Sequence, residues 1–149
     1  ALAASVGGLG VTAVPDPAAG LNAAVTAGLD SAAARWPEAA RAVLLADVPA
    51  LRPGDLASAL GAAAAYPRSF VPDHTGTGTV LLTARAGEPL VPHFGADSAR
   101  RHTAAGAVRL DLDLPGLRTD VDDAASLALV LALGAGPRVA ALAREAGLL

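Results

Sequence analysis

The residues of this sequence best suited to hold a metal ion are aspartates that follow predicted strands. Asp47 comes directly after the apolar run 41–46, at the carboxyl end of a strand, where α/β sheets gather their ligands. Asp120 and Asp122 are two residues apart, so they lie on one side of the chain if that segment is extended. Carboxylates from separate strands suit Mg²⁺, which takes oxygen ligands and keeps waters and substrate phosphates. The pattern therefore indicates a magnesium site, with Asp47 as its first candidate ligand.

The same acidic residues also have ordinary structural interpretations. Asp47 stands two residues before Pro49, a setting that suits a turn or a helix cap. Asp123 is suited to the N-cap of the helix predicted after it. For Asp47, the metal and turn interpretations both stay open at this point.

Two glycine-containing segments are suited to bind an anion. Thr75-Gly-Thr-Gly-Thr79 offers backbone amides and hydroxyls, although a flexible hairpin tip has the same composition. The segment from Gly95 to Ser98 enters a predicted helix, whose first amides and positive dipole end favour negative charge. Asp97 or Ser98 is equally suited to be an ordinary N-cap. The basic run 100–102 is either a phosphate clamp or the solvated face of that helix.

Other polar residues allow weaker predictions. Asn22, the only asparagine, follows Gly20 at the start of a predicted helix, and its amide can recognise a nucleobase or simply satisfy a loop backbone. His74, His93 and His102 lack metal-ligand spacing and have no cysteine partners, which argues against a zinc site.

Composition narrows the class of protein. A chain of 149 residues with 53% apolar residues and a net charge of −3 is expected to fold as one domain and not to bind nucleic acid. The absence of cysteine excludes disulfides and thiolate chemistry, and a reducing cytoplasm is the default location. No apolar run approaches the roughly 18 residues that a membrane span needs. The opening "ALAASVGGLG" lacks the positive stretch of a signal peptide, so we expect no targeting segment there.

Strand-like and helix-like segments alternate along the chain. This alternation predicts an α/β sandwich with a mostly parallel sheet, plus a small antiparallel insertion around residues 69–95. The predicted strands are 11–14, 41–46, 69–71, 79–83 and 107–112, and the predicted helices are 20–36, 53–65, 98–105, 123–133 and 137–146. Nothing before Val11 matches the phosphate-binding strand, loop and helix that usually open a doubly wound domain, so the chain is expected to begin inside the fold.

Five segments in this order resemble the 2-phospho-L-lactate or phosphoenolpyruvate guanylyltransferase family of coenzyme F-420 biosynthesis. They are "GLNAAV", "LLADVPALRPGDL", "FVPDHTGTGTVLL", "HFGADSARRH" and "PGLRTDVDDAASL", and together they cover residues 20 to 127. The wider superfamily includes molybdenum-cofactor guanylyltransferases. The resemblance implies a Rossmann-like three-layer sandwich. It also implies a reaction in which the phosphate of a three-carbon acid attacks the α-phosphorus of GTP and pyrophosphate leaves.

The resemblance also implies roles for individual residues. Asp47 and Asp120 would be the catalytic residues that hold Mg²⁺, with Asp122 as a further metal ligand nearby. The carboxylate of the acid would lie against Thr79, Gly95 and Ser98. Gly20 and Asn22 would lie toward the guanosine. The implied partners are GTP and either phosphoenolpyruvate or 2-phospho-L-lactate, with transfer of the product to the next enzyme, and neither nucleic acid nor a membrane.

One departure from the family pattern leaves alternatives open. The family's N-terminal strand and its basic loop, which grips the triphosphate, have no counterpart here. Residues 1–149 are therefore expected to be a single nucleotidyltransferase domain that lacks this strand and phosphate loop. The competing interpretations are another nucleotidyltransferase of the superfamily and a non-catalytic guanine-nucleotide-binding module. The sequence does not distinguish the two candidate acids.

Overall fold

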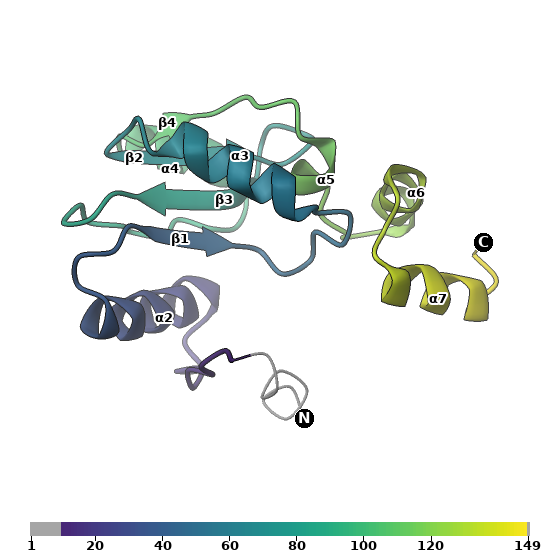
Figure 1. Ribbon diagram of the computed structural model, residues 1–149, viewed down its shortest axis with the longest axis horizontal. Coiled ribbons are helices and arrows are strands. Elements are labelled where there is room, and N and C mark those ends of the chain that lie inside the picture. The colour runs from purple at the N-terminus through teal and green to yellow at the C-terminus, as the bar shows by residue number, and fades with distance from the viewer. Residues whose placement is uncertain (1–9, 149) are drawn as a thin grey trace.

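A computed structural model describes residues 10–148 of the chain (Figure 1). The opening residues, for which no targeting segment is expected, lie mostly outside this range. The helices are α2 (Leu21–Arg35), α3 (Pro53–Ala63), α4 (Ser98–Ala104), α5 (Pro115–Arg118), α6 (Ala124–Leu133) and α7 (Pro137–Glu145). The strands are β1 (Arg41–Leu44), β2 (Arg68–Pro72), β3 (Thr79–Ala84) and β4 (Val108–Arg109).

The four strands form one mixed sheet in the order β1-β3-β2-β4. β3 is antiparallel to both β1 and β2, whereas β2 and β4 are parallel. The expected mostly parallel pairing is therefore wrong for the described sheet, although β1, β2 and β4 do run in one direction. The reason is the short turn between β2 and β3, because only antiparallel neighbours can be joined by so few residues. The predicted antiparallel insertion lies in the middle of the sheet rather than beside it.

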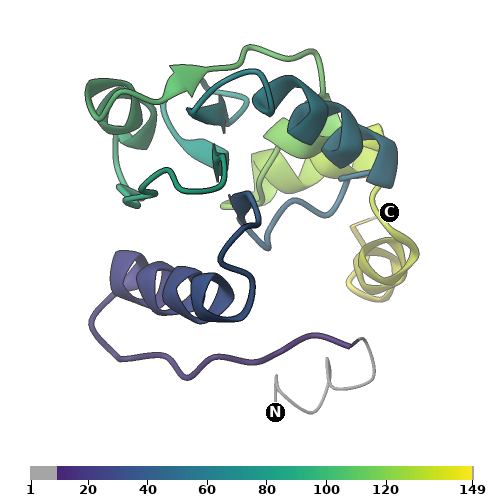
Figure 2. The same cartoon turned by 60° about the vertical axis from the view of Figure 1, so that its left-hand side comes forward.

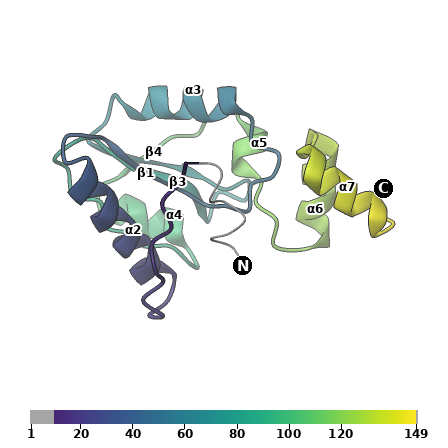
Figure 3. The same cartoon turned by 60° about the horizontal axis from the view of Figure 1, so that its bottom comes forward.

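Helices cover both faces of the sheet. α3 lies on one face, and α2 and α4 lie on the other (Figure 3). Side chains alternate between the two faces, so Phe70 and Leu82 pack toward α2 and α4, while Val71 and Leu81 pack toward α3. These two apolar clusters make an α/β protein with a core on each side of the sheet.

The predicted strand at residues 11–14 is not formed. This segment is irregular, and the side chain of Val11 is 55% exposed. Residues 10–14 instead run beside α2 (Figure 2). Gly10, Val11, Thr12 and Val14 line a surface groove together with residues of α2. A strand needs a neighbour to satisfy its backbone groups, and no described strand lies next to this one. β4 is also shorter than the predicted strand 107–112.

The C-terminal helices begin and end as their residue types predict. Asp123 caps α6, since its carboxylate accepts a 2.8 Å hydrogen bond from the amide of Ser126. Gly134 ends α6 in the left-handed conformation. α6 and α7 then lie at the end of the molecule away from α2, with their axes crossing (Figure 1). Among residues 10–148, no helix combines the length and the apolar character needed to cross a membrane.

Candidate active site

An acidic cluster forms where three loops meet at one end of the sheet. Asp47 follows β1, Asp73 follows β2, and Asp120 and Asp122 follow α5. The amide of Val121 donates a 3.0 Å hydrogen bond to the carbonyl of Asp47, which joins two of these loops directly. The structure thus brings the predicted pair Asp47 and Asp120 together, and it adds Asp73.

The carboxyl group of Asp120 is enclosed by this cluster and has a raised pKa. Its side chain is only 16% exposed, and burial is the main cause that raises its pKa. The negative charges of Asp122, Asp73 and Asp47 raise the pKa of Asp120 further. The other aspartates are less enclosed, apart from the buried Asp73. The site therefore holds more negative charge than its own residues compensate, which favours a cation.

His74 lies next to Asp120, and no role was predicted for His74 from the sequence. Its Nδ1 lies 3.7 Å from Oδ1 of Asp120, and its side chain is 37% exposed. The available signal was its position, since His74 directly follows Asp73 at the same end of the sheet as Asp47. A histidine at that position can face the site opening while it contacts the more enclosed carboxylate.

The glycine-threonine loop is organised around the carboxylate of Asp73. The amide of Thr77 and the hydroxyl of Thr75 each donate a 3.0 Å hydrogen bond to that carboxylate. A Cβ on Gly78 would lie 2.5 Å from Oδ2 of Asp73, so only glycine lets the chain pass there. Part of the anion-binding capacity predicted for this loop is thus already used by Asp73, a residue that sequence reasoning left unassigned.

Thr79 lies at the start of β3 and is buried against His102. Its Oγ1 is 2.9 Å from Nδ1 of His102, and Nε2 of His102 accepts a 3.0 Å hydrogen bond from the amide of His93. Because Nε2 is an acceptor, Nδ1 carries the proton and donates to Thr79. The hydroxyl hydrogen of Thr79 is then free to donate elsewhere. His102 is neutral, since burial first, and then the charges of His93 and Arg101, lower its pKa to about 4.

The turn before α4 lies next to this loop. The amide of Ala99 donates to the carbonyl of Thr77 over 3.0 Å, so Gly95, Ser98 and Thr79 sit on two adjoining segments. Gly95 has a φ of +107° and is exposed, whereas Ser98 is buried. Asp97 occupies the N-cap position, but its side chain makes no capping hydrogen bond. The ordinary N-cap interpretation of this aspartate is therefore not what the structure shows.

Asn22 is held by the backbone of the same turn. Its Nδ2 donates to the carbonyl of Phe94 over 3.1 Å, and its Oδ1 accepts from the amide of Phe94 over 2.8 Å. Gly20, with a φ of +89°, precedes α2 at its N-cap. Both polar atoms of the Asn22 side chain are thus engaged by the protein, as in the loop-backbone alternative.

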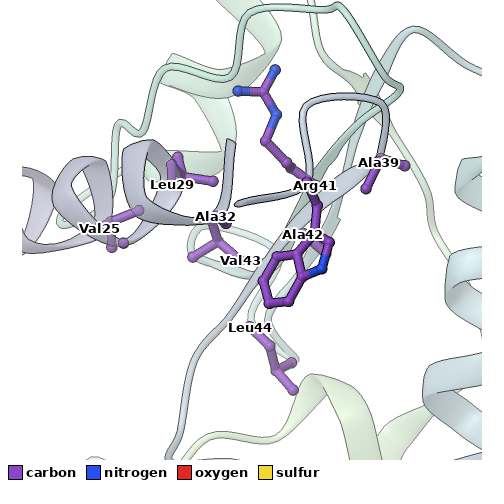
Figure 4. Close-up of a pocket in the computed structure, with 11 residues that line it drawn as sticks. Val25, Leu29, Ala32, Ala39, Arg41, Ala42, Val43 and Leu44 are labelled. Carbon is purple, nitrogen blue, oxygen red and sulfur yellow. The ribbon is translucent and has the colours of Figure 1, made fainter. Parts of the chain in front are cut away.

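A separate groove lies between α2 and β1 and contains none of the predicted site residues. It has a volume of about 460 Å³ and is mostly apolar. Figure 4 shows Val25, Leu29 and Ala32 of α2 facing Val43 and Leu44 across it. β1 is the edge strand among the described residues 10–148, so this groove runs along the side of the sheet on which no described strand pairs.

Comparison with known proteins places the chain in a family. No protein-family model matches it. A phosphoenolpyruvate guanylyltransferase of Streptomyces coelicolor is 52% identical over 137 residues, which cover 91% of the chain and 64% of that relative. A phosphoenolpyruvate guanylyltransferase of Sanguibacter keddieii is 57% identical over 87% of the chain and 48% of the relative. For one of Salinispora arenicola, the identity is 52%, over 95% of the chain and 66% of the relative.

The chain therefore spans about half to two thirds of the length of these relatives. The resemblance seen in the five sequence segments is confirmed at the level of the family. With about half of all aligned residues identical over most of its length, the chain belongs to the phosphoenolpyruvate guanylyltransferase family.

Proposed function

We propose that this chain transfers GMP from GTP to phosphoenolpyruvate, with release of pyrophosphate, as a step of coenzyme F-420 biosynthesis. The observation that carries the proposal is the meeting of Asp47 and Asp120 at one end of the sheet, in a chain whose relatives are named for this reaction. The names of these relatives favour phosphoenolpyruvate over 2-phospho-L-lactate.

In this proposal Asp47 and Asp120 hold Mg²⁺, with Asp122 beside them. Within residues 10–148, no three His, Cys, Asp or Glu side chains are already arranged around one metal position. Two carboxylates nevertheless fit Mg²⁺, because this ion completes its shell with water and substrate phosphates. The raised pKa of Asp120 supports the same assignment, since a bound cation would compensate the charge around it. When bound, Mg²⁺ neutralises charge on the reacting phosphate.

Thr79, Gly95 and Ser98 are the proposed contacts of the acid's carboxylate. The free hydroxyl hydrogen of Thr79 supports this role, because neutral His102 fixes the orientation of that hydroxyl. Gly95 is an exposed residue, and its backbone amide offers a second donor. These residues bind and orient the acid. A phosphate dianion is already a nucleophile at neutral pH, so no general base is assigned.

The proposed guanosine contacts of Gly20 and Asn22 have less support. A base would have to replace Phe94 as the hydrogen-bond partner of Asn22. The role that fits its geometry better is to hold the turn that presents Gly95.

The domain proposal is that a further strand and a phosphate-binding loop complete this fold at the free edge of β1. The amide of Leu45 donates a 3.0 Å hydrogen bond to the carbonyl of Val80 in β3. Because peptide groups along a strand point alternately to its two sides, those of Ala42 and Leu44 point away from β3. These groups, and the apolar groove beside them, offer a place for one more strand. The end of such a strand would lie near Asp47, where a triphosphate is required. Completed in this way, the sheet would approach the Rossmann-like arrangement.

The test is release of pyrophosphate from GTP with each of the two acids, with and without Mg²⁺. Asp47→Ala should abolish release while circular dichroism shows an intact fold, and Asp30→Ala, on the exposed side of α2, should leave it unchanged. Full turnover by Asp47→Ala would overturn the metal assignment. A panel of GTP, CTP and ATP separates the other nucleotidyltransferases of the superfamily.

A non-catalytic guanine-nucleotide-binding module is the second candidate. The relatives' extra length favours it for this chain taken alone, since residues needed for turnover can lie in that part. Calorimetry would then detect GTP binding without any release of pyrophosphate.

A further inference from the structure

Arg118 makes an unusual set of contacts beside the acidic cluster. Its guanidinium donates from Nε to the carbonyl of Pro72 over 3.1 Å and from Nη2 to the carbonyl of Asp73 over 3.0 Å. It also donates from Nη1 to the carbonyl of Leu112 over 3.3 Å. The ion pairs found within residues 10–148 do not include Arg118. All three of its hydrogen bonds therefore go to backbone oxygens.

These three acceptors connect two parts of the chain that meet at the proposed active site. Pro72 ends β2 and Asp73 follows it, directly before His74, while Leu112 belongs to the segment that leads into α5. Arg118 itself ends α5, two residues before Asp120. The half-buried guanidinium thus spans the junction at which the side chains of His74 and Asp120 come within 3.7 Å of each other.

The chemistry of arginine suits this bridging position. A guanidinium presents five N–H donors in a rigid plane, so it can bind several carbonyls at fixed angles. Lysine offers three donors on a flexible stem and cannot reproduce that plane. Backbone carbonyls do not move with a side-chain rotamer, so contacts to them fix the position of whole segments.

We propose that Arg118 is a positioning residue that holds the Asp73-His74 turn against the Asp120 segment, and so sets the arrangement in which Asp120 binds a divalent cation. The inference rests on the proposed function for the role of the cation, but the geometric claim stands apart from it. Arg118 acts through the backbone and is not assigned a contact with substrate.

Arg109 provides a matched control. Its Nη1 donates to the carbonyl of Gly76 over 2.8 Å, in the same loop, and its Nε pairs with Asp111 over 2.9 Å. It therefore binds the loop at its tip and connects it to β4 instead of to Asp120. If an effect arose only from the loss of a guanidinium, or from a general loosening of the loop, substitution of either arginine should produce it.

The first measurement is the NMR signal of the His74 ring in the unaltered chain and in Arg118→Met, Arg118→Lys and Arg109→Met. The signal is assigned with His74→Gln. We expect Arg118→Met to shift it, Arg118→Lys to shift it less, and Arg109→Met to leave it in place. An unchanged His74 signal in folded Arg118→Met, or an equal shift in Arg109→Met, overturns the proposal. If Arg118→Met does not fold, Arg118→Lys takes its place, and an unchanged His74 signal in that variant, or an equal shift in Arg109→Met, overturns the proposal.

The second measurement is the affinity for Mn²⁺ alone, followed by electron paramagnetic resonance of the free ion. Arg118→Met should weaken binding by about tenfold or more, as replacements behind metal ligands commonly do, while Arg109→Met stays within about twofold. Equal affinities of the unaltered chain and Arg118→Met contradict the proposed effect on the cation. If no variant binds Mn²⁺, including the unaltered chain, the metal role in the proposed function fails, and the His74 signal still decides whether Arg118 positions the turn.

Discussion

His102 shows at the scale of one residue how a buried polar group can support a site without facing solvent. It joins β3, α4 and the turn at His93 through two hydrogen bonds, and the one that Nε2 accepts from the amide of His93 requires a neutral ring. A charged ring would lose the acceptor at Nε2 and would be buried among apolar side chains. The fold therefore selects one protonation state of His102, which links folding to pH.

Stability should fall below neutral pH because of His102. Its folded pKa of about 4 lies below the unfolded value of 6.5, so the unfolded chain binds the proton more readily between these values. The stabilisation is complete above pH 6.5 and is lost as the pH falls through 4. The loss is on the order of 3 kcal/mol at most, from 1.36 kcal/mol per pKa unit. Urea unfolding at several pH values measures it.

His102→Gln provides the comparison for this prediction. Glutamine keeps an acceptor and a donor but does not titrate, so the variant should show a flatter dependence between pH 6.5 and 4. Because Asp120 and Asp123 contribute in both proteins, only the difference between the two curves is assigned to His102. Identical slopes for the unaltered chain and His102→Gln would contradict the assignment.

Gly78 gives a second prediction at this scale. A methyl group there would meet the carboxylate of Asp73 at 2.5 Å, so Gly78→Ala should cost about 1–3 kcal/mol, as overpacking commonly does. Gly61 lies inside α3 with open space around it, so Gly61→Ala should stabilise by about 0.5–1 kcal/mol. Thermal unfolding compares the two directly, and a neutral Gly78→Ala would show that the loop does not depend on Asp73.

At the scale of elements, local sequence predicted the helices better than the sheet. The ends of α6 follow from Asp123 and Gly134, whose conformations are set by nearest neighbours. Strand order depends on partners far along the chain, and nothing local indicated that β3 lies between β1 and β2. The strand predicted at residues 11–14 was wrong for the same reason, since its β-rich composition has no partner among the described strands.

In the candidate site, too, the features set by local sequence were predictable and those set by packing were not. Asp47 was predictable as a candidate because it follows a strand end, where α/β folds gather ligands. Asp120 follows helix α5, and it was singled out by its spacing from Asp122 and by the family resemblance. The hydrogen bonds from Arg118 to Pro72 and Asp73 were not predictable, because they depend on how two distant loops pack. Those of the Asp73 carboxylate are local, but they depend on the exact conformation of the glycine-threonine loop. Asn22 was noticed as a rare residue, but its pairing with Phe94 spans 72 positions.

The free edge of β1 can be tested with proline. Val43 faces β3 in the ladder and pairs with Leu82, whereas alternation places the N–H of Ala42 on the outer side. Val43→Pro should therefore cost about 1–3 kcal/mol more than Ala42→Pro, because only the former leaves a buried carbonyl unpaired. Urea unfolding measures the difference. An equal cost for the two variants would mean that Ala42 is hydrogen-bonded in solution and that the edge is not free.

At the scale of the whole molecule, the acidic cluster couples loops from separate elements, so cation binding should stabilise the entire fold. Burial and its acidic neighbours raise the pKa of Asp120, so ionisation of this carboxyl group opposes folding. Asp120→Asn should therefore raise the unfolding temperature in the absence of metal. Addition of Mg²⁺ to the unaltered chain should stabilise it by about 2.7 kcal/mol at a concentration one hundred times the Kd.

Stabilisation by Asp120→Asn and stabilisation by Mg²⁺ should not add up in the variant. Asp120→Asn removes both the repulsion and a proposed ligand, so it should gain little from Mg²⁺ even though it starts from a higher unfolding temperature. Asp30→Asn, on the exposed side of α2, should respond to Mg²⁺ as the unaltered chain does. Calorimetric unfolding with increasing Mg²⁺, with Ca²⁺ as a second cation, measures these shifts at constant ionic strength. If Asp120→Asn gains as much as the unaltered chain, the cation binds elsewhere, and the proposed role of Asp120 must be abandoned.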